Sequence, residues 1–368
     1  MSGVTPCEAC GIVRRAPASQ TVRGPTGFHY TGSEPAQPSG GVPLPGKPRS
    51  VHSPPMARIP DPSSTGPRAP ASGLRHWTTR ALLDWMTGAF REKGLDAPRL
   101  CAELLVAHVI GCERLRLYME ADRPASDLER DHLRALVARA LRHEPVQYLV
   151  GEAWFFSLPM KVDRRVLVPR PSSETIVEHL LQTVRADPGL APGGALVIAD
   201  VCTGSGCLAV AILKNLPGAR ALATDLSPPA LEVAHLNAQR HGVFDRIELL
   251  QGDLLSPLES HPAGHGLHAL VSNPPYIPDH EWAEVPPNVK DFEPELALRA
   301  GPDGLAFVRP LIEQGPDHLR PGGLLFVEIA SSTAASVLEL ARASPRLTGA
   351  RIVDDFEGLP RVLFARRV

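Results

Sequence analysis

Residues 195–206 read Ala-Leu-Val-Ile-Ala-Asp-Val-Cys-Thr-Gly-Ser-Gly, and this stretch decides the fold. Its first seven residues are apolar except for Asp200, which is typical of a strand buried on both faces of a sheet. Two glycines follow, just before a helical pattern at 208–216. Glycine there allows a tight turn and lets a ligand approach backbone N–H groups closely. A strand, a glycine turn and a helix in this order predict the start of an α/β domain.

The same alternation continues downstream. Apolar runs at 220–224, 247–250, 267–271 and 324–329 have the character of strands, and residues 229–240 have the spacing of a helix. We therefore predict an α/β fold with an open, parallel, Rossmann-like sheet covered by helices on both faces. Ligands of such sheets bind beyond the carboxyl ends of the strands, near the point where the strand order reverses.

A carboxylate ends the second predicted strand. Asp225 lies 19 positions after Gly206, where it can accept hydrogen bonds from a ribose diol. A dinucleotide fingerprint would need glycine at 202, 204 and 207, but two of these are cysteine, so the loop favours S-adenosylmethionine over NAD. A tight turn that binds nothing is the structural alternative. The predicted cofactor-binding residues are Cys202, Thr203, Gly204, Ser205, Gly206 and Asp225, with Asp253 and Leu254 after the third strand, toward the adenine edge, and Asn273 after the fourth.

The fourth strand leads directly into Asn273-Pro274-Pro275-Tyr276. Consecutive prolines fix two φ angles and remove two N–H donors, so the segment is rigid and its carbonyl groups are free to accept hydrogen bonds. The side-chain carbonyl of Asn273 and the backbone carbonyl of Pro274 can together accept both hydrogens of a planar NH2 group. Tyr276 can stack on the plane of that group. Such a motif can also be a simple turn without a catalytic role. The place of this motif at the end of a predicted strand argues against that alternative.

This arrangement suits methyl transfer to an amide or amino nitrogen. The lone pair of such a nitrogen is delocalised, so it is a poor nucleophile. Acceptors for both N–H groups increase the charge on nitrogen and hold it in line with a methyl donor, and positioning of this kind supplies roughly 7–11 kcal/mol of a barrier. We predict Asn273, Pro274 and Tyr276 as catalytic residues, and these three with Pro275 as substrate-binding residues.

The chain divides by composition into four parts. Residues 1–72 contain 14 Pro, 9 Gly and 9 Ser, which predicts a disordered tail. Residues 77–148 have helical periodicity, with a capping box predicted at Ser126 to Glu129, and predict a small helical domain. Periodicity alone leaves two roles open for this domain, a stabilising cap and substrate docking. Residues 150–168 alternate like strands, including a run at 166–168, and predict a hairpin linker. Residues 169–368 form the predicted catalytic domain.

Charge and cysteine content restrict the function further. Residues 1–72 carry 7 Lys and Arg against 3 Asp and Glu, and the remaining residues carry 31 against 37. The part of the chain after residue 72 therefore has a net negative charge. A negatively charged domain binds phosphate poorly, so we expect no direct nucleic-acid binding. No apolar stretch is long enough for a membrane span, and six cysteines in 368 residues indicate a reducing cytoplasm rather than a disulfide framework. Cys7 and Cys10 have metal-ligand spacing without a second pair, so no metal site is predicted.

Several motifs together resemble one known family. The glycine loop, the Asn-Pro-Pro-Tyr motif, Val-Pro-Arg-Pro at 168–171 and Glu-Pro-Glu-Leu-Ala-Leu at 293–298 resemble the protein-glutamine methyltransferases that modify bacterial peptide chain release factors. The similarity runs from about residue 78 to residue 364. The Asn-Pro-Pro-Tyr motif alone is also shared with adenine-N6 DNA methyltransferases, whereas the helical domain and the Glu-Pro-Glu-Leu stretch are far more specific.

The resemblance implies a specific reaction. A methyl group would pass from S-adenosylmethionine to the side-chain amide of the glutamine in the Gly-Gly-Gln loop of a release factor. Asn273 and Pro274 would hold the amide, the loop 202–206 and Asp225 would hold the cofactor, and the helical domain would contact the protein substrate. Cys202 stands where the family usually has glycine, and Ser172-Ser173-Glu174 replaces Glu-Thr-Glu.

Three other functions remain open at this point. A glutamine methyltransferase for a large-subunit ribosomal protein is the runner-up, because the Cys-Thr-Gly-Ser-Gly-Cys loop at 202–207 resembles those sister enzymes. A DNA adenine methyltransferase shares the Asn-Pro-Pro-Tyr chemistry but is disfavoured by the net negative charge after residue 72. A cofactor-binding scaffold without catalysis is the non-enzyme alternative.

Overall fold

The computed structural model describes residues 77–190 and 195–368. The predicted disordered tail at 1–72, with Cys7 and Cys10, lies outside these residues. Among the described residues, no helix is both long enough and apolar enough to cross a membrane.

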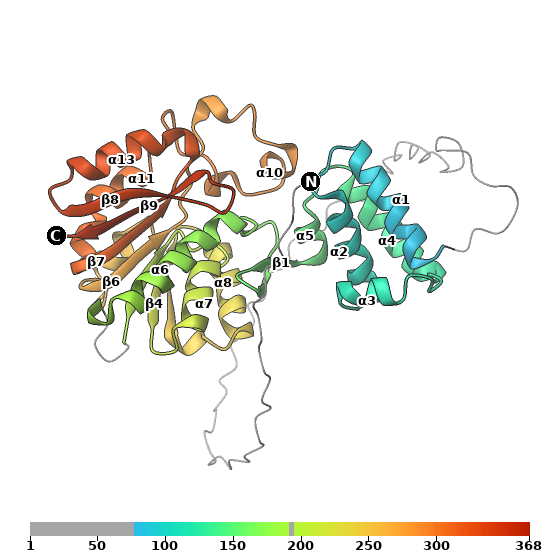
Figure 1. The fold of residues 1–368 in the computed structure, drawn as a ribbon, viewed down its shortest axis with the longest axis horizontal. Helices are drawn as coiled ribbons and strands as arrows, with labels where there is room; N and C mark the ends of the chain where they lie inside the picture. Colours follow the sequence, from blue (N-terminus) through green and yellow to red (C-terminus); the bar gives the residue numbers. More distant parts are fainter. Residues whose placement is uncertain (1–76, 191–194) are drawn as a thin grey trace, which may run out of the picture. The chain divides into compact units, whose positions relative to one another are not determined.

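Seven strands form one sheet in the order β5-β4-β3-β6-β7-β9-β8 (Figure 1). The five strands β5, β4, β3, β6 and β7 are parallel to one another, and the strand order reverses between β3 and β6. The predicted Rossmann-like architecture and its reversal point are therefore present. The strands are β3 (Val197–Val201), β4 (Arg220–Asp225), β5 (Ile247–Gln251), β6 (Leu267–Ser272), β7 (Leu319–Glu328), β8 (Leu347–Asp354) and β9 (Pro360–Arg367).

The prediction of an all-parallel sheet is wrong at one edge. β9 pairs antiparallel with β7, and β8 pairs antiparallel with β9. A hairpin joins β8 and β9 at Asp355, whose carboxylate accepts hydrogen bonds from the N–H groups of Glu357 and Leu359. Since a hairpin needs no crossover helix, the strand–helix alternation gives no signal for β9, whereas β8 follows a helix and is also absent from the predicted strands.

The sheet is buried on both faces because its strands alternate their side chains between two cores. Ile198 of β3 belongs to one apolar core, and its neighbour Ala199 belongs to the other. Figure 1 shows α6, α7 and α8 side by side over one face. These helices are α6 (Glu174–Ala186), α7 (Cys207–Asn215) and α8 (Pro228–Arg240), and the other face carries α9 (Ser256–Glu259), α11 (Val308–Glu313), α12 (Gly315–His318) and α13 (Ala334–Ala343).

The helical region has its own apolar core, to which Met86, Phe90 and Leu105 contribute fully buried side chains. The capping box predicted at Ser126 is confirmed: its hydroxyl accepts from the N–H of Glu129, and the Glu129 carboxylate accepts from the N–H of Ser126. Five helices rather than the three indicated by periodicity build this region. They are α1 (Thr79–Glu92), α2 (Pro98–Ile110), α3 (Arg114–Met119), α4 (Asp127–Ala140) and α5 (Val146–Val150).

A two-stranded hairpin follows, formed by β1 (Glu152–Phe155) and β2 (Leu158–Lys161). The strand-like run at 166–168 is not part of it, which corrects the sequence interpretation. Its backbone forms no strand pairing. The Val166 N–H donates to the Asp163 carbonyl in a turn, the Tyr148 hydroxyl donates to the Val166 carbonyl at 2.5 Å, and the Val168 N–H donates to the Glu293 carboxylate at 3.1 Å.

Glu144 connects α4 to the segment after the hairpin, and this contact makes stability depend on pH. Its buried carboxylate accepts two hydrogen bonds from Arg139, both at 2.7 Å, and one from Arg164 at 2.9 Å. The Arg139 guanidinium is the main cause that lowers the pKa of Glu144 to about 2, and Arg164 adds to it, against the opposing effect of burial. The folded protein therefore holds the charged form more strongly than the unfolded chain does.

We expect Glu144→Gln to lower the free energy of unfolding by about 1–2 kcal/mol at pH 7, because both arginines lose their charged partner. A lowered pKa stabilises the fold above the unfolded value near 4.5, and this contribution disappears as pH falls toward 2. The difference between wild type and variant, measured by denaturant unfolding, should therefore shrink between pH 5 and about pH 2. A difference that is constant over this range would contradict the assignment.

Candidate active site

The register of the sheet brings the predicted site residues to one edge. Val201, the last residue of β3, pairs with Thr224 of β4 and with Ser272 of β6, and all three strands are parallel. Asp225, which ends β4, and Cys202 and Asn273, which follow β3 and β6, therefore lie at the same carboxyl edge. This is the place where ligands of open α/β sheets bind.

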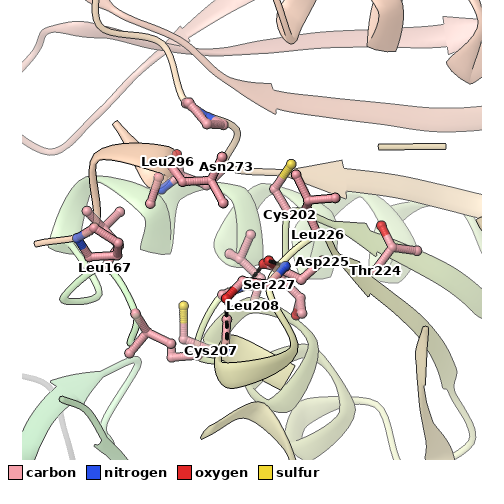
Figure 2. Close-up of a pocket in the computed structure, with 18 of the residues that line it drawn as sticks. Leu167, Cys202, Cys207, Leu208, Thr224, Asp225, Leu226, Ser227, Asn273 and Leu296 are labelled. Carbon is pink, nitrogen blue, oxygen red and sulfur yellow. Dashed lines mark hydrogen bonds between the residues drawn. The ribbon is translucent and has the colours of Figure 1, made fainter. Parts of the chain in front are cut away.

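A large open cavity lies at this edge, enclosing about 990 Å³ including the space at its mouth. Figure 2 shows Leu167 and Leu296 on one side of it and Asp225 and Leu226 on the other. All but one of the predicted cofactor-binding residues line it. They are Cys202, Thr203, Gly204, Ser205, Asp225, Asp253, Leu254 and Asn273.

Gly206, the remaining predicted residue, is not among the lining residues; it packs against a helix instead. Its φ is +77°, and a Cβ atom there would lie 3.1 Å from the Cβ of Ala234 and 3.2 Å from its Cα, on α8. Cys202 and Gly204 also have positive φ, of 60° and 54°. The loop therefore curls tightly between β3 and α7, and Gly206 lets α8 approach it.

This packing predicts a selective loss of stability on adding one methyl group. Gly206→Ala should lower the free energy of unfolding by about 2–4 kcal/mol, from left-handed backbone strain plus the clash with Ala234. Gly242→Ala is the matched control, because Gly242 has φ +64° but open space around it, and it should cost only about 1 kcal/mol. Equal losses in the two variants, measured by denaturant unfolding, would show that the contact with α8 has no effect.

Asp225 is held in place by the backbone around it. One carboxylate oxygen accepts from the N–H of Gly204 at 2.8 Å. The other accepts from the N–H of Ser227 at 2.9 Å, and Figure 2 shows Asp225 beside Ser227. Each oxygen keeps a further lone pair for a ligand. Burial raises the pKa of Asp225, and the two N–H groups oppose this rise.

Two cysteines and a second carboxylate complete the environment of the loop. Burial, followed by the charge of Asp225, raises the pKa of Cys202, and burial raises the pKa of Cys207 to about 12. Both thiols are therefore protonated at neutral pH and are poor nucleophiles.

Asp200 is fully buried, which raises its pKa to about 7, and it accepts from the hydroxyl of Thr203 at 2.7 Å and the N–H of Ala209 at 3.1 Å. Through these two hydrogen bonds, Asp200 holds the loop between β3 and α7 in place.

Asn273 is oriented by Ser173, which is not among the predicted site residues. Its side-chain nitrogen donates to the hydroxyl oxygen of Ser173 at 2.9 Å. Ser173 is buried and ends the short helix η1 (Pro171–Ser173). Because the nitrogen is engaged there, the side-chain carbonyl oxygen of Asn273 is the atom that remains as a hydrogen-bond acceptor.

A second cavity meets the first at Asn273. Asn273, Leu167 and Ala297 line both cavities, whereas Tyr276 and Arg170 line only the second. The remaining residues of the second cavity are all apolar: Ile277, Val285, Pro286, Val289 and Leu298. Asn273 therefore stands at the junction between two chambers, a place suited to a group transferred from one ligand to another.

The other residues of the motif lie in different places. Pro275 lines the first cavity, and Pro274 is buried and lines neither, so its carbonyl as an acceptor stays a prediction. The Tyr276 hydroxyl donates to Glu328 at 3.3 Å. Stacking of the Tyr276 ring on a substrate amide also stays a prediction.

Glu293, the first residue of the Glu-Pro-Glu-Leu motif, orders the segment that leads to Ser173. It is buried, accepts from the N–H of Val168 and forms an ion pair with Arg170. The Pro-Arg-Pro stretch at 169–171 was a recognisable signal for this segment. The contact with Asn273 had no local signal, because the two partners are 100 positions apart.

Comparisons with known proteins identify the family. The family model of the PrmC N-terminal domain matches residues 81–151, and that of the methyltransferase small domain matches 173–285. The release factor glutamine methyltransferase of Chlorobaculum tepidum is 41% identical over 78% of this chain and 96% of its own length. The proteins of the same name from Rhodopirellula baltica and Geobacter sulfurreducens are 37% and 40% identical, over 78% and 71% of this chain and 95% and 87% of their own lengths. The chain belongs to the release factor glutamine methyltransferase family.

Membership of this family confirms the resemblance seen in the sequence and makes the chain an S-adenosylmethionine-dependent methyltransferase. A solved methyltransferase from Pyrococcus furiosus also matches, with a TM-score of 0.41 and 19% identity over 62% of this chain and 96% of that one. Within the described residues, no group of three or more His, Cys, Asp and Glu side chains is placed to hold a metal ion.

The first cavity fits the cofactor of this family. Asp225 offers fixed acceptor oxygens for a ribose diol, and Leu226 beside it presents an apolar surface suited to a planar base. Gly204 exposes backbone without a side chain, since no atom lies within 4 Å of where its Cβ would be. We infer that the loop 202–205, Asp225, Asp253 and Leu254 hold S-adenosylmethionine, which supplies a methyl group on a positively charged sulfur.

Proposed function

We propose that this methyltransferase modifies the side-chain amide of the glutamine in the Gly-Gly-Gln loop of peptide chain release factors. The observation that carries the proposal is the oriented side chain of Asn273 at the junction of two cavities, in a chain whose relatives are named release factor glutamine methyltransferases. A glutamine amide and the amide of Asn273 are complementary, since one donates through its NH2 group and the other accepts through its free carbonyl oxygen.

In this proposal the residues of the chain position the nitrogen. Asn273 accepts one N–H of the substrate amide and the Pro274 carbonyl accepts the other, so the nitrogen faces the first cavity. These acceptors stabilise the positive charge that develops on nitrogen as its bond to the methyl carbon forms and the carbon–sulfur bond breaks. The methylated nitrogen then releases a proton to water, which restores the neutral amide without a strong base.

The second cavity suits the side chain of a glutamine that a protein loop presents. Its apolar walls suit the carbon chain of a glutamine that a loop extends into the site, much as DNA enzymes extract a base.

We also propose that the helical region contacts the substrate protein. Its helix α3 exposes Leu115 and Met119, with 70% and 78% of each residue accessible. Cytoplasmic location and the absence of direct nucleic-acid binding stay predictions.

The test is mass spectrometry of substrates incubated with enzyme and S-adenosylmethionine. We expect one added methyl group on the Gly-Gly-Gln peptide of a purified release factor. Large-subunit ribosomal proteins and duplex DNA are incubated in parallel, because Cys202 and the Asn-Pro-Pro-Tyr motif are shared with enzymes acting on these. Methylation of a ribosomal protein or of adenine, with none on the release factor, would refute the proposal.

A further inference from the structure

Glu328 is a buried carboxylate that the proposed reaction does not use. It is the last residue of β7, is fully buried and lines neither cavity. One of its oxygens accepts hydrogen bonds from the hydroxyls of Tyr276 and Ser172, both at 3.3 Å. The other has no hydrogen-bond partner in the described part of the chain. Burying a carboxylate is costly, so its position calls for a compensating role.

The two hydroxyls belong to the two segments that form the acceptor corner. Tyr276 ends the Asn-Pro-Pro-Tyr motif, three residues after Asn273. Ser172 precedes Ser173, the residue that fixes the side-chain nitrogen of Asn273. One oxygen of Glu328 therefore joins the wall of the second cavity to the segment that orients Asn273.

Charged and titratable groups from several elements face this carboxylate. Burial raises the pKa of Glu328, while the hydroxyls of Ser173, Ser172 and Tyr276 and the charge of Arg361 on β9 act against this rise. Arg361 is itself paired with Asp355 at 3.1 Å, so its charge is shared. The hydroxyls and Arg361 thus favour the ionised form of Glu328, which accepts hydrogen bonds.

We propose that Glu328 is a positioning residue for methyl transfer, which sets the geometry of Tyr276 and of the Ser172–Ser173 segment and thereby that of Asn273. This inference rests on the proposed function. Without the shared acceptor, the Tyr276 ring and the Ser173 hydroxyl are free to move, and misplacement by about 1 Å is enough to cost a large factor in rate. Binding of the cofactor should be unaffected, because Glu328 does not reach the first cavity.

The test compares two substitutions at this position. Glu328→Leu removes the acceptor, and we expect it to lower kcat by about 30-fold, the scale of one or two hydrogen bonds to a charged group. Glu328→Gln keeps one acceptor oxygen for both hydroxyls and should stay within about fivefold of wild type. The dissociation constant of S-adenosylhomocysteine, measured by calorimetry, should change by no more than about threefold in both variants.

A double-mutant cycle separates positioning from general stability. In a Tyr276→Phe background, Glu328→Leu should lower kcat by a clearly smaller factor than in wild type, because one of its bonds is already absent. Glu339→Gln, an exposed glutamate on α13, is the control and should leave kcat unchanged. If Glu328→Leu does not fold, the single variants Ser172→Ala and Tyr276→Phe test the inference instead. Each should lower kcat by about 3–10-fold and leave the affinity for the cofactor unchanged.

Three results would overturn the inference. They are equal losses of kcat in Glu328→Leu and Glu328→Gln, an undiminished loss in the Tyr276→Phe background, and a loss of cofactor affinity that parallels the loss of kcat. If Glu328→Leu does not fold, an unchanged kcat in both Ser172→Ala and Tyr276→Phe would also overturn the inference. If wild type does not methylate the release factor, the proposed function fails instead. The coupling between positions 276 and 328 is then measured in the free energy of unfolding, where an absence of coupling refutes the contact.

Discussion

Replacing Asn273 with alanine is expected to lower kcat/KM for methyl transfer by about 10³-fold. The side-chain oxygen that remains after the bond to Ser173 is made is the proposed acceptor for the substrate amide, and removal of one preorganised polar group from a reaction site costs about 10²–10³-fold or more. The alanine variant also loses the Ser173 contact, so the neighbouring segment is less constrained. Transfer of labelled methyl to purified release factor is the measurement.

Cofactor affinity distinguishes this loss from general damage. Asn273 is one of many residues lining the first cavity, so we expect the dissociation constant of S-adenosylhomocysteine to change by no more than about threefold. Asn215→Ala, which replaces an exposed asparagine at the end of α7, is the matched control and should retain full activity. An Asn273→Ala variant with more than a tenth of wild-type kcat/KM would contradict the role given to this residue.

The second large effect is expected at Asp225. Asp225→Asn should weaken binding of S-adenosylhomocysteine about 100-fold in calorimetry. The charged acceptor becomes a neutral amide with one acceptor oxygen, and hydrogen bonds to charged groups contribute about 1.5–3 kcal/mol each. The amide nitrogen would also face a backbone N–H that now donates to a carboxylate oxygen, from either Gly204 or Ser227. The oriented loop is therefore disturbed together with the acceptor.

Asp245→Asn is the control for this substitution, because Asp245 is an exposed aspartate on the same domain. It should bind the cofactor product as wild type does. At saturating S-adenosylmethionine, Asp225→Asn should recover most of the wild-type kcat, since the acceptor corner is intact. Binding within threefold of wild type would remove Asp225 from the cofactor site.

The parts of the site that follow strands could be predicted from sequence. Strand–helix alternation locates the carboxyl ends of β3, β4, β5 and β6, and the register of a parallel sheet then brings the residues after them together. Cys202, Asp225, Asp253 and Asn273 line one cavity for this reason. The helical region was recognisable because amphipathic spacing and the Ser126 capping box are local signals.

The residues that orient the site could not be predicted in the same way. Ser173 lies 100 positions from Asn273, and Ser172 lies 156 from Glu328, so these hydrogen bonds depend on the folded chain and leave no periodic pattern. Glu328 resembles any polar residue that ends a strand until its burial is known. β9 has no such signal either, because a hairpin and not a helix connects it to β8.

A structure of the enzyme with S-adenosylhomocysteine and a glutamine-containing Gly-Gly-Gln substrate tests the central claim most directly. We expect the substrate amide nitrogen within about 3.2 Å of both the Asn273 side-chain oxygen and the Pro274 carbonyl oxygen, facing the sulfur of the cofactor product. A glutamine bound elsewhere, or an Asn273 oxygen turned into protein packing and away from the sulfur, would contradict it.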